Sequence, residues 1–336
     1  MDYEGRICRT PGEKSAFKLP VSVGCPYNKC AFCDLFKDLE YRELPLEQIE
    51  AELVRVKDVG GAPKRVMLGD GNGFYLPFER LMTVLRMIEE HLPSVELVSS
   101  DASIPSIAAK TDEQLAELAS HGLRLVYIGI ESGLDDVLKF MHKDHNNTQA
   151  RTQIARLQAH GIDYGAHIMT GIAGTGRGIE NARATAAFLN ETHPTYVCNF
   201  SMGVGPLTEL GLMEEDGLFT AASVRECLEE ERELLFLLED PLRFEGFHFT
   251  YDRSQVDCAT FEGSVPEFND YVTSWTHTFG NLPHDREKLI AQLDAAIAAA
   301  PDDDAGVASI TQGPASEGPA SQDQASQGSA SQGSAA

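Results

Sequence analysis

Three of the seven cysteines in this chain of 336 residues stand together, in the pattern Cys25-x4-Cys30-x2-Cys33. Thiolates spaced in this way within one short segment are typical metal ligands. A structural zinc ion needs a fourth ligand, which usually comes from a second cysteine or histidine pair. The remaining cysteines offer no such pair, because they are isolated in the sequence: Cys8, Cys198, Cys227 and Cys258.

Three thiolates suit a cubane [4Fe–4S] cluster, because they bind three of its irons and leave the fourth iron open for an exogenous ligand. The sequence therefore predicts a [4Fe–4S] cluster with a reactive iron at Cys25, Cys30 and Cys33. The cysteines alone leave an alternative open, which is a non-catalytic protein that holds structural zinc or a redox-sensing cluster.

Between residues 18 and 201, short β-branched segments alternate with helical patterns. This alternation is typical of successive βα units around a parallel sheet. Six strands are predicted, and the cysteine cluster directly follows the first of them: 19–23, 65–68, 96–99, 125–130, 164–169 and 196–200. Six strands are too few for a closed eightfold barrel, so we predict an α/β fold, a partial (βα)6 barrel with its site at the C-terminal rim.

Helices are predicted between these strands. Apolar residues recur at helical spacing after Pro45 and after Pro77, and a proline suits the first turn of a helix. Thr111 precedes a further helix as part of a capping-box pattern, and Gly122 and Gly161 end helices directly before strands.

The cysteine triplet and the βα order together resemble the radical S-adenosylmethionine (SAM) superfamily over roughly residues 18–201. In that family the triplet binds a [4Fe–4S] cluster, and the free iron chelates the amino and carboxylate groups of SAM. The usual spacing is C-x3-C-x2-C, so the additional residue between Cys25 and Cys30 departs from it. Phe32 before Cys33 matches the aromatic-Cys ending of the family, and the resemblance assigns it to the cofactor site.

The resemblance also implies that SAM is bound by residues at the ends of later strands. Gly69, Asp70 and Gly71 stand where the family has a Gly-Gly-Glu-like turn, and Asp70 would accept a hydrogen bond from the amino group of SAM. Ser100, in Ser99-Ser100-Asp101, would add a polar side chain to the rim.

After the next two strands, Glu131 would accept hydrogen bonds from the ribose hydroxyls, and Gly171 and Gly174 match a glycine-rich segment near the adenine. Structural alternatives stay open at each place. The glycines suit ordinary turns, and Glu131 suits an acid that a helix dipole stabilises.

Composition changes along the chain predict four regions: an N-terminal extension (1–17), a core partial barrel (18–201), an α-rich C-terminal extension that caps the barrel (202–300) and a disordered low-complexity tail (301–336). The extension holds predicted helices at 225–238 and 286–297. It also holds candidate pocket residues, for each of which packing is the alternative: His248, Tyr271, Trp275 and His277. His142 and His145 are expected in a solvated loop.

The chain is strongly acidic, with 52 Asp and Glu against 27 Lys and Arg and a formal net charge of −25. This charge makes a nucleic-acid partner a poor expectation, because polyphosphates would be repelled at long range. It is also compatible with a salty habitat. The sequence contains no apolar run long enough for a transmembrane helix and no export signal, so we expect a cytoplasmic protein without membrane contact.

The sequence thus predicts a radical SAM enzyme that reductively cleaves SAM at a [4Fe–4S] cluster. The resulting 5′-deoxyadenosyl radical would act on an unidentified, small-molecule substrate. The resemblance also implies a one-electron donor, flavodoxin or ferredoxin, as a partner. The catalytic residues that contact the substrate are not identified from the sequence.

Overall fold

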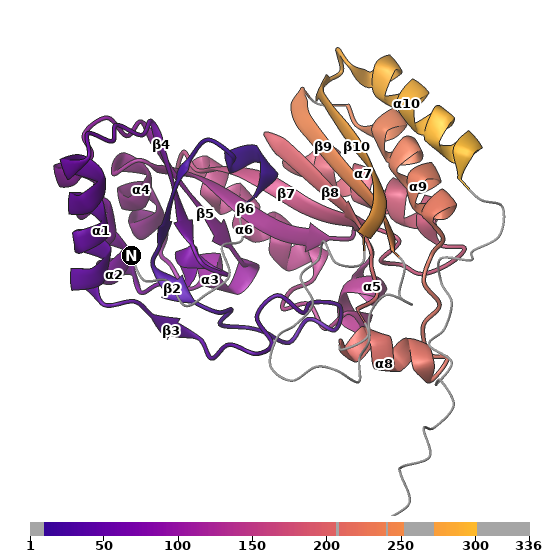
Figure 1. Cartoon of the computed structure of the whole chain (residues 1–336), viewed down its shortest axis with the longest axis horizontal. Coiled ribbons are helices and arrows are strands. Elements are labelled where there is room, and N and C mark those ends of the chain that lie inside the picture. The colour runs from indigo at the N-terminus through magenta and orange to yellow at the C-terminus, as the bar shows by residue number, and fades with distance from the viewer. Residues whose placement is uncertain (1–9, 206–207, 240, 252–271, 301–336) are drawn as a thin grey trace, which may run out of the picture.

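Eight strands form one sheet in a computed structural model that describes residues 10–205, 208–239, 241–251 and 272–300 (Figure 1). The order is β1-β4-β5-β6-β7-β8-β9-β10, and neighbours are parallel except for the antiparallel pair β9 and β10. The strands are β1 (Phe17–Pro20), β4 (Arg65–Gly69), β5 (Leu97–Ala102), β6 (Leu123–Glu131), β7 (Asp163–Thr170), β8 (Tyr196–Ser201), β9 (Leu242–Tyr251) and β10 (Val272–Leu282).

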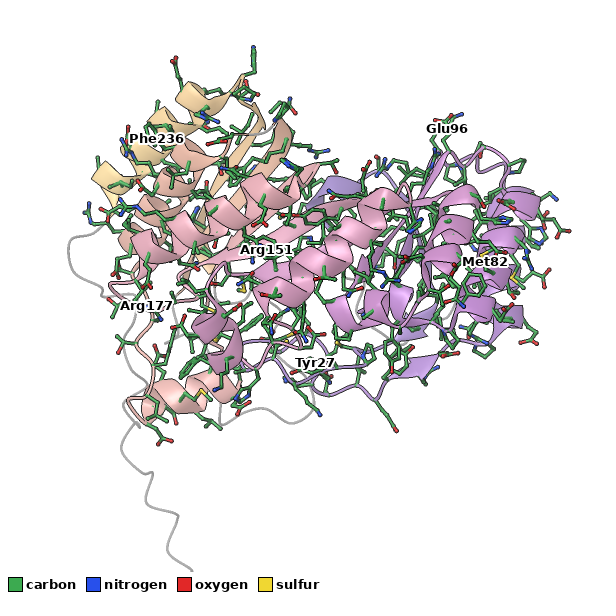
Figure 2. All side chains as sticks on the ribbon, turned by 180° about the vertical axis from the view of Figure 1, so that it is seen from behind. Tyr27, Met82, Glu96, Arg151, Arg177 and Phe236 are labelled. Atoms are coloured by element: carbon green, nitrogen blue, oxygen red, sulfur yellow. The ribbon has the colours of Figure 1, made fainter. Side chains whose placement is uncertain are left out.

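Helices cover one face of this sheet, and Figure 2 views the molecule from that side, with Arg151 on α6 and Met82 on α2 labelled. The α-helices are α1 (Leu46–Asp58), α2 (Phe78–His91), α3 (Ile104–Ala108), α4 (Asp112–Ser120), α5 (Asp135–Phe140), α6 (Asn147–Ala159), α7 (Gly178–Thr192), α8 (Glu209–Glu215), α9 (Val224–Leu237) and α10 (Arg286–Ala299). There are also two short 3-10 helices, η1 (Pro11–Glu13) and η2 (Gly73–Tyr75).

Local sequence signals account for many of the helix boundaries. The helices predicted after Pro45 and Pro77 are α1 and α2. The capping box at Thr111 is confirmed, since its side chain accepts a hydrogen bond from the backbone N–H of Gln114. Gly122 and Gly161 have φ of 86° and 76°, a left-handed conformation that glycine adopts without steric cost.

Side chains alternate along each strand between the helix-covered face and the opposite face, which we call the inner face. The helix-covered face supplies the main apolar core, with strand residues that include Leu19, Val66, Leu68, Val98, Val126, Ile128, Ala166, Ile168, Val197 and Phe244. The inner face carries a smaller cluster: Ala16, Met67, Tyr127, Tyr196, Cys198 and Phe247. At its N-terminal end, Glu13 of η1 accepts hydrogen bonds from Arg65 and from the Tyr127 hydroxyl.

The six predicted βα strands are all present, but the first differs in detail. The predicted strand at 19–23 is divided at Val21 into β1 and a second, two-residue strand, β2 (Ser22–Val23), which pairs with β3 (Arg42–Glu43). Val21 still bridges the two parts, because its N–H donates to Gly69 and its carbonyl accepts from Leu44. The division turns the chain away from the sheet directly before the cysteines.

The C-terminal region contains more than the predicted helices. The helices α9 and α10 match the predicted ones closely, but β9 and β10 extend the sheet and were not predicted. β9 lies parallel to β8, and the connection between them contains α9, as a parallel crossover requires. The predicted tail at 301–336 lies outside the described residues.

Among the described residues, no helix combines the length and the apolar character that crossing a membrane requires.

If β9 and β10 share the core of the βα units, truncating Phe244 should destabilise the whole chain. Phe244 is fully buried in that core, whereas Phe279 on β10 is 43% exposed. We expect Phe244→Ala to lower the free energy of unfolding by about 3–5 kcal/mol in urea denaturation, because it leaves a cavity. Phe279→Ala, the matched control, should cost less than about 1 kcal/mol. A Phe244→Ala variant whose first 200 residues unfold as in wild type would contradict a shared core.

Candidate active site

The three clustered cysteines lie on the loop between β2 and β3, at the C-terminal edge of the sheet. Cys25, Cys30 and Cys33 are half-buried, and none of them forms a disulfide. The loop has neither helix nor strand between residues 24 and 41. Its conformation therefore has to be fixed by hydrogen bonds and packing.

Some of the hydrogen bonds that fix the loop join residues of the loop itself. Asn28 adopts a left-handed conformation with φ of 48°, and its backbone N–H donates to Cys25 Sγ at 3.4 Å. Its side-chain amide donates to the carbonyl of Phe36 at 2.7 Å. The ammonium of Lys37 donates to the carbonyls of Asn28 and Cys30, at 2.9 and 3.1 Å. The loop is thus closed on itself around the thiols.

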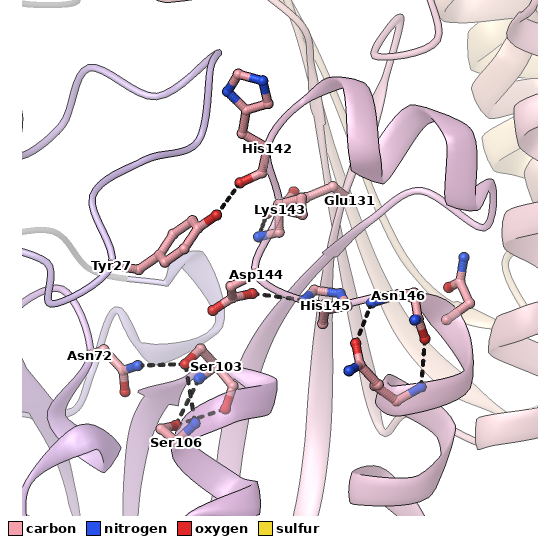
Figure 3. A network of polar contacts seen from close by, with 12 residues as sticks. Tyr27, Asn72, Ser103, Ser106, Glu131, His142, Lys143, Asp144, His145 and Asn146 are labelled. Carbon is pink, nitrogen blue, oxygen red and sulfur yellow. Dashed lines mark hydrogen bonds and ion pairs between the residues drawn. The ribbon is translucent and has the colours of Figure 1, made fainter.

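Segments distant in sequence hold the loop from outside. The N–H of Ala31 donates to the carbonyl of Met141 at 3.0 Å, and the Tyr27 hydroxyl donates to the carbonyl of His142 at 2.5 Å (Figure 3). The N–H of Leu210 donates to the carbonyl of Ala31 at 2.9 Å. The loop between α5 and α6 and the start of α8 therefore position the cysteines.

Phe32 contributes to this arrangement through packing. It packs against a second apolar cluster, which includes Ala31 of the cysteine loop: Ala31, Val137, Met141, Ile172, Met202, Val204, Leu210 and Phe219. These residues come from the loop itself, α5, α8 and the segments after β7, β8 and α8. The position of Phe32 is that of a packing residue next to the thiols.

The environment of the thiols suits a cluster. Burial raises the pKa of Cys33 to about 12, and burial also raises the pKa of Cys30, against the lowering effect of Lys143. The thiolates therefore need positive charge, which iron supplies. Among the described residues, no three His, Cys, Asp or Glu side chains converge on one point as ligands of a single metal ion do. Thiolates that each bind a separate iron of a cubane do not need to converge in that way.

Glu131 ends β6 beside this loop, in a left-handed conformation with φ of 62°. Its Oε1 accepts a hydrogen bond from Lys143 Nζ at 3.1 Å, and both side chains are almost completely buried. Burial opposes the charge of Lys143, but the carboxylate of Glu131 and a thiolate at Cys30 raise the pKa of the lysine. Because α5 begins only at Asp135, the partner of Glu131 is this lysine and not a helix dipole.

The turn after β4 lies against the cysteine loop. Gly71 has φ of 57°, and a Cβ there would collide with the backbone of Gly24. A Cβ on Gly69 would collide with the Lys18 side chain. Asp70 is completely buried; its N–H donates to Ser22 and its carbonyl accepts from the Ser22 hydroxyl. Close approach and a left-handed backbone thus require glycine at position 71, whereas a side chain at position 69 would displace the end of the Lys18 side chain.

The glycine-rich turn after β7 is held from the helix side. Gly171 and Gly174 have φ of 81° and 80°. The N–H of Gly171 donates at 2.7 Å to Glu230 Oε2 of α9, and Glu230 Oε1 accepts from the Asn181 amide at 2.6 Å. Asn181 in turn accepts a hydrogen bond from Ser132, the residue after Glu131. Glu230 therefore links the ends of β6 and β7, both of which the sequence analysis assigned to the cofactor.

Ser100 of β5 is in register with Leu68, the residue before Gly69. It is completely buried beneath η2, and its hydroxyl donates to the backbone carbonyl of Asp101 at 3.0 Å. Strand alternation instead directs Ser99 and Asp101 to the inner face. A one-residue offset decides this outcome, because successive side chains of a strand point to opposite faces.

The histidines of the C-terminal region have packing and hydrogen-bonding partners. His248 is buried on the helix-covered face, 2.8 Å from Glu231 Oε2. His277 stacks on Phe247 with 4.7 Å between ring centroids and lies 3.0 Å from Glu245. Trp275 belongs to β10, and Tyr271 lies outside the described residues.

His142 and His145 are predicted to lie in a solvated loop, and this is confirmed for His142 but wrong for His145. His142 is exposed, whereas His145 is buried against Asp144 (Figure 3). The sequence analysis missed Lys143 between them, and it missed Glu230. Lys143 sits in a basic, polar segment directly after α5, which was the available signal. Glu230 belongs to an acidic run on α9 that resembles a solvated helix face.

Comparison with known proteins now defines the class. The sequence profile described as "Radical SAM superfamily" matches residues 19–187, just over half of the chain. The chain therefore belongs to the radical SAM superfamily, and its cofactors are a [4Fe–4S] cluster and SAM. No curated protein sequence matches the chain significantly.

Solved structures of radical SAM enzymes are similar to this chain. Coproporphyrinogen III oxidase (HemN) from Escherichia coli has a TM-score of 0.51 and 13% identity, over 66% of this chain and 51% of that protein. The methyltransferase TsrM from Kitasatospora setae has a TM-score of 0.49 and 17% identity, over 60% and 39%. Methylornithine synthase (PylB) has a TM-score of 0.48 and 15% identity, over 68% and 65%. The chain thus spans less than two thirds of the length of each.

Glu230 leads to a prediction about stability and pH. Burial raises the pKa of Glu230 from an ordinary 4.5 to about 8, although its two hydrogen bonds lower it. The folded protein therefore binds this proton more tightly than the unfolded chain does, so the stability contributed by Glu230 falls as pH rises from about 4.5 to about 8.

The variant Glu230→Gln keeps the side chain neutral. Rotation of the Asn181 amide lets Asn181 accept a hydrogen bond from the amide of the new glutamine. We expect its melting temperature, relative to wild type, to increase steadily from about pH 5 to about pH 8 in calorimetry at equal iron content. Glu229→Gln, on the exposed side of the same helix, is the matched control. If the difference in melting temperature between Glu230→Gln and wild type is constant over this pH range, Glu230 is not protonated in the folded protein.

Proposed function

We propose that this protein cleaves SAM reductively and uses the resulting radical on a small-molecule substrate. The observation that carries the proposal is the position of the three thiols. Cys25, Cys30 and Cys33 stand on one loop, next to the ends of β4, β6 and β7, where Asp70, Glu131 and Gly171 lie.

In this proposal Cys25, Cys30 and Cys33 would hold the [4Fe–4S] cluster. When bound and reduced, the cluster would supply the electron for reductive cleavage of SAM to methionine and a 5′-deoxyadenosyl radical. The contribution of the chain is to bind and orient the cofactors and to exclude water and thiols from the radical.

The charged residues around the thiols have complementary roles toward SAM. Asp70 would accept a hydrogen bond from the amino group of SAM, and Lys143, a buried cation within electrostatic range of Cys30, would meet the carboxylate of SAM. Glu131 would accept from the ribose hydroxyls while Lys143 holds the Glu131 carboxylate in place. Gly171 and Gly174 would let the backbone approach the adenine closely.

A one-electron donor such as flavodoxin or ferredoxin completes the reaction, because the chain itself supplies no electron. The net charge of −25 favours a small molecule over a nucleic acid as substrate. The cytoplasmic location stays a prediction from the sequence.

The test is to reconstitute the full chain anaerobically, reduce it with dithionite and measure 5′-deoxyadenosine released from SAM. We expect release by wild type and by Cys198→Ala, in which the cysteine replaced is buried away from the loop. Cys25→Ala, Cys30→Ala and Cys33→Ala should each lose most of the iron and fall to background release. Near-full iron in all three variants would refute the ligand assignment. One bound zinc per chain without nucleoside release would instead establish the non-catalytic alternative.

Lys143 provides a second test. Replacing a buried charge-assisted hydrogen bond typically costs about 1.5–3 kcal/mol, so Lys143→Met should weaken SAM binding by at least about tenfold in equilibrium dialysis. Lys139→Met, which removes an exposed lysine of α5, is the matched control and should bind SAM like wild type. Equal SAM affinity in both variants would exclude Lys143 from the cofactor site.

A further inference from the structure

The inner face of the sheet carries two polar side chains, Asp101 on β5 and His167 on β7, that a single hydroxyl bridges. Strand alternation places both on the inner face, because the next residues, Ala102 and Ile168, belong to the helix-side core. The hydroxyl of Thr10, the residue before η1, lies 3.4 Å from Asp101 Oδ1 and 3.4 Å from His167 Nε2. Three segments that are distant in sequence therefore meet at this point.

Asp101 and His167 both keep hydrogen-bonding capacity. A contact of 3.4 Å is long for a hydrogen bond, so Thr10 satisfies each of them only weakly. Their second polar atoms, Asp101 Oδ2 and His167 Nδ1, have no hydrogen-bond partner among the described residues, and neither atom is shut off from solvent. Both side chains are half-buried. A ligand can therefore reach one oxygen of Asp101 and one nitrogen of His167.

The proton on the bridging hydroxyl makes both of these atoms acceptors. A carboxylate can only accept, so the single proton of Thr10 Oγ is donated to Asp101 Oδ1. Thr10 Oγ can then accept from His167 Nε2–H, which leaves Nδ1 without a proton. Burial raises the pKa of Asp101 to about 6 and lowers that of His167 to about 4. At about pH 8 the carboxylate is therefore charged and the imidazole is neutral.

The charge around Asp101 is not balanced. The other acids near the inner face have basic partners: Arg65 beside Glu13, Lys18 beside Asp70, Lys143 beside Glu131 and Lys14 beside Glu245. Within the described part of the chain, no basic side chain stands at ion-pair distance from Asp101. Lys18 lowers the pKa of Asp101 from farther away, but Asp70 and Glu13 oppose it. This environment favours a ligand with a positive charge.

The two acceptors lie next to the proposed cofactor site. His167 is in register with Gly129 of β6, and Glu131 Oε1 and Lys143 Nζ occupy the space that a Cβ of Gly129 would need. Glu131 and Lys143 are also close enough to His167 to influence its pKa. A ligand held by Asp101 and His167 would therefore lie beside the residue that we assign to the ribose of SAM.

Neighbouring rings hold the imidazole in place before a ligand arrives. Tyr127 stacks on His167 with 5.8 Å between ring centroids, and Phe200 meets it edge-on at 6.2 Å. A side chain that is already ordered loses little freedom on binding. Phe200 is itself half-buried, so it offers apolar surface next to the two acceptors.

We propose that Asp101 and His167 bind a protonated primary amine of the substrate, with Asp101 Oδ2 and His167 Nδ1 accepting hydrogen bonds from its ammonium group. The substrate is then a small amine. That the bound amine is the substrate rests on the proposed function. That the two side chains recognise an ammonium group rests on the accessible acceptors and the unbalanced charge.

The experiment compares three probes that share one aromatic ring and differ in their polar group: phenethylamine, phenethyl alcohol and phenylacetate. Each is titrated calorimetrically at about pH 8 into the full chain, reconstituted with its cluster and saturated with SAM but not reduced. We expect phenethylamine to bind at least about tenfold more tightly than the other two. Equal or tighter binding of the alcohol or the acid, or no binding of the amine, would overturn the proposal.

Variants locate the binding. Asp101→Asn keeps the shape of the side chain and removes its charge, so it should weaken phenethylamine binding by about tenfold or more and leave phenethyl alcohol binding unchanged. His167→Phe keeps a ring between Tyr127 and Phe200 and should weaken amine binding by about threefold. Asp163→Asn, at the exposed opposite end of β7, removes the same charge and should change neither affinity.

Unchanged amine affinity in Asp101→Asn and His167→Phe would overturn the assignment, and His167→Phe decides alone if Asp101→Asn does not fold. An equal loss in Asp163→Asn would also overturn it, because the effect would then come from the net charge of the chain. These titrations need no SAM cleavage. Their failure in protein with a full cluster therefore counts against the amine site and not against the proposed function.

Discussion

The structure depends on one constraint: three thiols must be held in place on a loop that has no secondary structure of its own. A helix or strand fixes its side chains through its own backbone hydrogen bonds, but residues 24–41 lack that support. The backbone contacts of Ala31 with Met141 and Leu210, and that of Tyr27 with His142, replace it. The site is therefore built by segments that meet only when the sheet has formed.

Charge is distributed unevenly in this acidic protein. The chain has about two acids for each base, yet Lys18 and Lys143 are both buried near the C-terminal edge of the sheet. Each has a carboxylate within 4 Å, Asp70 for Lys18 and Glu131 for Lys143, which offsets part of the desolvation cost. The buried ammonium groups near the proposed cofactor site are thus held as ion pairs.

The C-terminal region is part of the same sheet and supports the cofactor edge. α9 lies in the crossover between β8 and β9 and places two adjacent buried acids against the sheet. Glu230 holds the turns after β6 and β7, and Glu231 binds His248, Thr278 and Asn199. One helix therefore couples the last strands to the turns that the cofactor would contact.

The sequence by itself determined the βα order, the helix boundaries at Thr111 and Gly122, and the position of the cysteine triplet after the first strand, because periodicity and capping are local properties. It also indicated Asp70, Glu131 and Gly171, since each ends a recognisable strand. Tertiary structure alone decided that the side chain of Asp101, and not that of Ser100, lies on the inner face of the sheet. It also decided that Lys143 and Glu230 lie near the C-terminal edge, and that β9 and β10 extend the sheet. Those outcomes depend on strand register and on contacts between segments far apart in the chain, and no local pattern encodes them.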